Sequence, residues 1–129
     1  MGHEIDDRNP IWIKEKADNF FKNKDYRSAI NVYNRCIEID PDFHKCYLNR
    51  ATCLFYLGEF DLALQDLNKL TYMIENIDAK EKEDMFYTKI LIKIKVKTYA
   101  IHAITNNYTE ALEILSTILT KDNTFILGD

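Results

Sequence analysis

The sequence predicts an all-α protein built from antiparallel helix pairs, because its residues recur at a fixed interval. Small and aromatic residues repeat every 34 positions, namely Ala17 and Ala51, Phe21 and Phe55, Tyr26 and Phe60, and Ala29 and Ala63. Only three glycines and two prolines occur in 129 residues, whereas all-β folds with many turns need more of both. A single helix pair cannot bury its own apolar face, so we expect about three pairs to stack.

The recurring residues have distinct predicted roles within a pair. The alanines let the two helices approach closely. An aromatic residue just after the turn is expected to plug each pair, and Tyr26, Phe60 and Tyr108 hold that place. Proline cannot continue a helix, so Asp40-Pro41 ends the second helix of the first pair.

A third copy of the pattern lies nearer the C-terminus. Ala111 follows Ala63 by 48 residues, which is one period of 34 plus 14. We therefore expect residues 78–91 to be an insertion, a loop followed by an early extension of the next helix, so that residues 86–104 form one helix. The segment KILIKIKVK alternates lysine with apolar residues, which taken alone favours a β-strand, but the repeat context favours the helix.

Composition and charge argue against several classes of function. The net charge is -4, whereas nucleic-acid binding rests on a basic surface. No apolar run approaches the ~18 residues of a membrane span. The polar, acidic N-terminus is not a secretory signal, so we expect a cytoplasmic protein. No Gly-rich phosphate loop, HExxH or CxxC motif occurs, so we predict no catalytic residues, no cofactor and no enzyme activity.

The three cysteines, Cys36, Cys46 and Cys53, do not form a disulfide framework, because their number is odd and their spacing is irregular. Free buried cysteines suit a reducing compartment. Cys46 and Cys53 lie seven residues apart on one helix face, and with His44 nearby a metal site is conceivable. We favour the simpler interpretation, in which both are small core side chains and no metal is bound.

These spacings resemble those of the tetratricopeptide repeat, an all-α right-handed superhelix of antiparallel helix pairs. The resemblance divides the chain into a tail (1–9), copy one (10–43), copy two (44–77), the insertion (78–91), copy three (92–125) and a short end (126–129). In that family the first helices of the pairs line a concave groove where ligands lie. The resemblance therefore implies a protein–protein interaction module.

A narrower resemblance is to the members of this family that act as co-chaperones. Their groove binds the acidic C-terminal tails of the seventy- and ninety-kilodalton heat-shock chaperones through a "carboxylate clamp" of lysine, asparagine and arginine. The corresponding positions here hold Lys14, Asp18, Asn49, Lys93 and Lys97. The groove lining would include Phe21, Leu48, Thr52 and Phe55. Three clamp residues match, Lys97 replaces an arginine, and Asp18 replaces an asparagine.

Two features put the clamp in question. An ionised Asp18 accepts hydrogen bonds only and would face a ligand's carboxylate, although Lys14, one helical turn earlier, could pair with it. The register of copy three also has an alternative. A shift by one residue puts Ala100 instead of Tyr99 at a position that usually holds a small residue, and that shift removes Lys93 and Lys97 from the clamp.

The segments NPIWIKEKADNFFKNKDYRSAINVYNRCIEID and YLNRATC also resemble the C-terminal repeat domains of co-chaperones for axonemal dynein assembly, with Trp12 and residues 47–51 carrying the likeness. That resemblance implies an upstream CS domain and a role in the preassembly of dynein motors for cilia. The alternatives are a scaffold that binds a different peptide or helix in the groove, and an accessory domain of a phosphatase or prolyl isomerase.

Self-association is a further alternative. Repeat arrays usually carry a final solvating helix, and none follows copy three here, which suggests truncation or a face covered by a partner. We expect an exposed apolar face at the C-terminal end, made of Ile118, Leu119, Phe125, Ile126 and Leu127.

Overall fold

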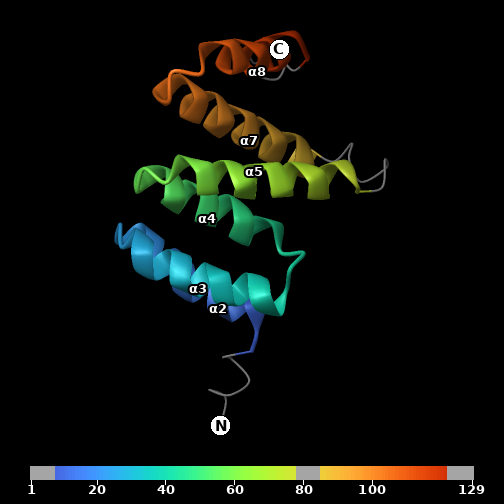
Figure 1. The fold of residues 1–129 in the computed structure, drawn as a ribbon. Coiled ribbons are helices and arrows are strands. Elements are labelled where there is room, and N and C mark those ends of the chain that lie inside the picture. The colour runs from blue at the N-terminus through green and yellow to red at the C-terminus, as the bar shows by residue number, and fades with distance from the viewer. Residues whose placement is uncertain (1–7, 78–84, 122–129) are drawn as a thin grey trace. The chain divides into compact units, whose positions relative to one another are not determined.

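The computed structural model describes residues 8–77 and 85–121, and within these ranges all regular secondary structure is α-helical (Figure 1). The helices are α2 (Pro10–Lys22), α3 (Tyr26–Ile39), α4 (His44–Tyr56), α5 (Phe60–Glu75), α7 (Met85–Ile104) and α8 (Tyr108–Lys121). The all-α prediction is confirmed. The chain divides into two compact units, Met1–Met73 and Ile74–Asp129, which are described separately below.

The first unit contains α2, α3, α4 and most of α5, and consecutive helices run antiparallel (Figure 1). The alanines predicted to let the helices approach are all buried, namely Ala17, Ala29, Ala51 and Ala63. Around Ala17 and Ala29 the core is completed by Ile13, Tyr33 and the cysteines. Helix α2 begins at Pro10 because Asn9 caps it, accepting hydrogen bonds from the backbone N–H groups of Ile11 (2.9 Å) and Trp12 (3.4 Å).

Three turns join the helices within pairs, and they repeat the same geometry. Each holds one residue with positive φ, which are Lys24 (61°), Gly58 (77°) and Asn106 (66°). These residues are separated by 34 and 48 positions, the intervals that the sequence pattern predicts. Each of the three donates its backbone N–H to the carbonyl three residues earlier, and the next residue donates to the carbonyl five residues earlier.

The third turn decides the register of α7. Because α7 runs without interruption into this turn, the turn fixes every position along the helix. Lys93 and Lys97 therefore correspond to Lys45 and Asn49 of α4. The alternative with Ala100 in place of Tyr99 is wrong.

Helix α7 also settles the competing interpretation of KILIKIKVK. These residues form α-helix and not β-strand, as predicted for residues 86–104. Ile90 and Ile94 are buried four residues apart, whereas Val96 is exposed, so burial follows the helical period. Among the described residues, no helix is both long enough and apolar enough to cross a lipid bilayer.

Two expectations about α8 are wrong. Tyr108 does not plug its turn, since it is 62% exposed and its hydroxyl donates to Asn106. The physical reason is its neighbour, because α7 holds Ala103 where α2 and α4 hold the aromatic residues that contact Tyr26 and Phe60.

Ile118 is not part of an exposed apolar face, because it is only 6% exposed. It lies seven residues after the buried Ala111, on the side of α8 that packs against α7. Leu119 is exposed as expected, and Phe125, Ile126 and Leu127 lie outside the described residues.

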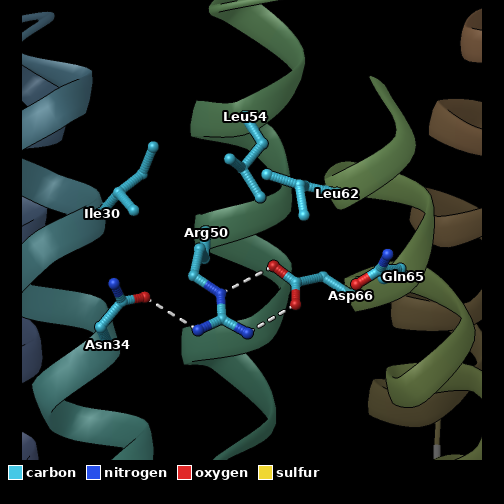
Figure 2. Close-up of a pocket in the computed structure, with 7 residues that line it drawn as sticks. All are labelled: Ile30, Asn34, Arg50, Leu54, Leu62, Gln65 and Asp66. Atoms are coloured by element: carbon cyan, nitrogen blue, oxygen red, sulfur yellow. Dashed lines mark hydrogen bonds and ion pairs between the residues drawn. The ribbon is translucent and has the colours of Figure 1, made fainter. Parts of the chain in front are cut away.

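A mostly buried ion pair between α4 and α5, with one hydrogen bond to α3, connects these three helices (Figure 2). Arg50 of α4 donates from Nε and from its terminal nitrogen to the two oxygens of Asp66 on α5, at 2.8 and 2.6 Å. Its other terminal nitrogen donates to Asn34 of α3 at 2.9 Å. Asp66 is only 8% exposed, and the bidentate hydrogen bonds from Arg50 compensate the burial of its carboxylate.

The cysteines lie in the core, as the simpler interpretation predicts. Cys46 of α4 donates to Cys36 of α3, with 2.9 Å between the sulfur atoms, and Cys36 donates to the carbonyl of Pro10 at 3.3 Å. Burial raises the pKa of all three thiols, that of Cys53 to about 12. They are therefore protonated at physiological pH.

Replacing Arg50 with methionine should destabilise the first unit strongly. Asp66 would keep a buried charge without its partner, and such breakage costs about 3–5 kcal/mol. The free energy of unfolding is measured by urea denaturation followed by circular dichroism. The matched control is Arg27→Met, which breaks the exposed pair with Glu59 and should cost less than about 1 kcal/mol. Equal losses in the two variants would contradict the structural role of Arg50.

The thiols should be unreactive in the folded protein. Because only the thiolate attacks, we expect Ellman's reagent at pH 8 to modify the native cysteines at least about a hundredfold more slowly than the unfolded ones. The rate of modification of the native thiols should rise only at higher pH than that of the unfolded ones, because burial raises their pKa. Unfolding in urea should expose three reactive thiols. A thiol that reacts in the native state at the unfolded rate would show that one cysteine is not buried.

Candidate functional site

The candidate site is built around Asp18 of α2, one of the predicted clamp positions. Its Oδ2 accepts from the ammonium of Lys14 at 2.6 Å. Its Oδ1 accepts from the hydroxyl of Tyr33 on α3 and from Nδ2 of Asn49 on α4, the latter at 3.1 Å. Three helices of the first unit therefore place their polar groups on one carboxylate.

The Lys14–Asp18 pair was predicted, because residues four apart on a helix are neighbours. Both side chains are mostly buried, with 17% and 27% exposure. The low local dielectric strengthens a charge-assisted hydrogen bond of this kind. Lys14 is thus directed toward Asp18.

Tyr33 was not predicted as a site residue. Burial, followed by its hydrogen bond to Asp18, raises the pKa of its phenol, so it stays a hydrogen-bond donor. A signal for it exists in the sequence. In an antiparallel helix pair, residues at similar distances from the turn lie opposite each other, and Asp18 and Tyr33 lie seven and eight residues from Asp25.

A cavity of about 280 Å³ opens beside this carboxylate. It is lined by Asp18, Phe21, Lys22, Tyr33 and Asn49. The predicted residues Lys14, Asp18, Phe21 and Asn49 thus lie together in the first unit. Its lining combines the ring of Phe21 with the polar groups around Asp18, a combination that suits a peptide.

The other predicted lining residues differ in exposure. Leu48 and Phe55 are half-buried, and Phe55 packs edge-on against both Tyr56 and Phe60. Thr52 is buried, and its hydroxyl donates to the carbonyl of Leu48 at 2.9 Å. Thr52 therefore contributes to helix packing and offers no outward-facing donor.

Lys93 and Lys97 belong to the second unit, and they lie four residues apart on α7. Lys93 is exposed and Lys97 half-buried. Burial, with a smaller contribution from Lys93, lowers the pKa of Lys97. Helix α7 also carries Lys89 and Lys95 but no carboxylate, although the whole chain has a net charge of -4.

A second cavity, of about 250 Å³, lies between α3, α4 and α5 (Figure 2). Its polar floor is the Arg50 network, and Ile30, Leu54 and Leu62 supply its apolar wall. The guanidinium of Arg50 already donates to Asp66 and Asn34. We therefore interpret this cavity as a gap between the packed helices of the first unit and not as a binding site. Within the described ranges, no three His, Cys, Asp or Glu side chains are grouped so that they could hold a metal ion.

Comparison with protein families matches two tetratricopeptide repeat models to this chain, over residues 15–43 and 32–65. Among curated proteins, dynein axonemal assembly factor 4 of Pongo pygmaeus is 32% identical over 82 residues, which cover 60% of this chain and 20% of the relative. Sperm-associated antigen 1 of Rattus norvegicus is 39% identical over 57 residues, covering 44% of this chain and 6% of the relative. The matched segments thus span a small part of these relatives.

Solved structures of low sequence identity share the fold. The Arabidopsis OM64 TPR domain superposes with a TM-score of 0.69 at 22% identity, covering 88% of this chain and 83% of that one. The TPR2AB domain of yeast Sti1, solved as a pHSP90 complex, gives a TM-score of 0.68 at 20% identity, covering 88% of this chain and 40% of that one. Together with the helix pairs and their repeated turns, these matches identify residues 15–65 as tetratricopeptide repeats.

Proposed function

We propose that this chain is a protein-interaction module of the co-chaperone type that docks acidic C-terminal tails of heat-shock chaperones. The observation that carries the proposal is the composition of α7. Lys89, Lys93 and Lys97 follow one another at intervals of four, so they share one face of a helix that has no carboxylate. In a chain of net charge -4, such a face favours an acidic partner.

The comparisons support this choice of partner. Two solved structures of the same fold are TPR domains of yeast Sti1, described as a pHSP90 complex and a pHsp70 complex. The likeness to dynein axonemal assembly factor 4 adds a role for this module in dynein-arm assembly in the cytoplasm. Such a module acts by binding and not by catalysis.

Self-association is the second candidate function, and the surface of α8 favours it. Tyr108, Leu112 and Leu119 are exposed and lie along one face of the helix, since they are four and seven residues apart. Exposed apolar patches of this kind mark association surfaces. The occupant proposed for this face is a second copy of the chain.

The lysines of α7 should be needed for binding an acidic tail. Lys93→Ala and Lys97→Ala should each weaken binding of a synthetic chaperone tail peptide by roughly ten- to hundredfold, because a hydrogen bond to a charged group contributes about 1.5–3 kcal/mol. Isothermal titration calorimetry measures the affinity, which should also fall with added salt. The control is Lys95→Ala, which removes the same charge from another face of α7 and should change little. Equal effects at all three positions, or none, would count against a docking role for this face.

Self-association should depend on the apolar face of α8. At high protein concentration we expect sedimentation velocity to show dimers, and Leu112→Glu, which places a charge on that face, should shift the population to monomer. Glu113→Gln is the control on the same helix and should leave the population unchanged. A monomer at all concentrations would remove this candidate while leaving tail docking intact.

A further inference from the structure

The donors that a carboxylate-binding groove would offer are already engaged in the first unit. Lys14 and Asn49 hold positions that bind the ligand's carboxylate in the clamp that this chain resembles. Here both donate to Asp18, and Tyr33 supplies a third hydrogen bond. The side chain of Asp18 thus accepts the hydrogen bonds that these residues would donate to a ligand's carboxylate.

The remaining acceptor site of Asp18 suits a hydrogen-bond donor of a ligand and not a second acceptor. A carboxylate has about four acceptor sites, and three hydrogen bonds to Asp18 are present. The side chain is still 27% exposed and lines the cavity of about 280 Å³, so it can accept one more hydrogen bond there. An N–H group of a ligand satisfies this acceptor, whereas a carboxylate would be repelled by it.

The size and lining of the cavity lead to the same ligand class. The charge of Lys14 is paired with Asp18, so the ammonium of Lys14 is not directed at a ligand. Ligand cavities usually measure about 300–1,000 Å³, so this one is sized for a single side chain. The ring of Phe21 provides an apolar surface for that side chain.

We infer that Asp18 determines which peptides this cavity binds. The cavity takes an internal peptide segment, which places an apolar side chain on Phe21 and donates an N–H to Asp18. It does not take a free C-terminal carboxylate. The inference deepens the proposed function and rests on it for the identity of the peptide. The terminal carboxylate of an acidic tail would then contribute little to binding in this cavity.

Calorimetry with two matched peptides tests this assignment. The probe is a synthetic chaperone tail peptide, prepared as the free acid and as the C-terminal amide. The wild-type protein should bind the two forms with affinities within about twofold. Asp18→Asn should bind the free acid at least about tenfold more tightly than the amide, because the substitution removes a like charge, adds a donor and frees Lys14.

Two control variants separate this effect from a general change in charge or stability. Glu15→Gln removes one negative charge from the exposed surface of α2 and should keep the wild-type ratio. Lys14→Gln in the Asp18→Asn background should abolish the new preference, because the freed ammonium is its source. Thermal unfolding of each variant verifies that the first unit remains folded.

The outcomes distinguish this inference from the proposed function. A wild-type preference of tenfold or more for the free acid, or an unchanged ratio in a folded Asp18→Asn variant, would overturn the inference while tail docking stands. If the wild-type protein binds neither peptide but Asp18→Asn gains free-acid binding, the role of Asp18 stands and chaperone tails are not the partner.

Discussion

The turn that contains the positive-φ residue fixes the register of the two helices that it joins. At Lys24, Gly58 and Asn106 the chain reverses with the same pair of backbone hydrogen bonds, so the helices enter and leave each turn at equivalent positions. Glycine adopts this conformation without steric cost, and asparagine tolerates it better than most residues. Once this turn is set, the alanines meet at the close approach of the helices, and the predicted clamp positions share one register.

Within that framework, two carboxylates of the first unit have different roles although both are held by a cation. Asp66 is 8% exposed, and both of its oxygens accept hydrogen bonds from the guanidinium of Arg50. Asp18 is more exposed, and its cation is the single ammonium of Lys14, although both carboxylates line cavities. An ammonium on a flexible stem can exchange partners, so Asp18 and not Asp66 is suited to ligand recognition.

The features that the sequence predicted correctly depend on local geometry or on the repeat interval. The Lys14–Asp18 pair needs only helical spacing, and helix α7 needs only the repeat context to outweigh a misleading alternation. The hydrogen bond of Asn49 to Asp18 could not be predicted in this way, because it joins two helix pairs and depends on side-chain directions across them, whereas the place of Tyr33 opposite Asp18 follows from its distance to the turn. The exposure of Tyr108 was missed for a related reason, since the aromatic plug requires a partner ring on the preceding helix and Ala103 stands there.

The two units differ in how their lysines are paired with carboxylates, and this difference bears on the proposed recognition of acidic peptides. In the first unit the ammonium of Lys14 is neutralised by an internal carboxylate, so the groove there offers an acceptor and an apolar ring. In the second unit α7 keeps its lysines without any acidic residue in the helix, and the pKa of Lys97 is lowered mainly by burial and to a smaller extent by repulsion from Lys93. An acidic ligand relieves that repulsion, whereas it gains little at Asp18. The lysines of α7 would therefore favour a negatively charged ligand, whereas Asp18 disfavours a carboxylate in the cavity of the first unit.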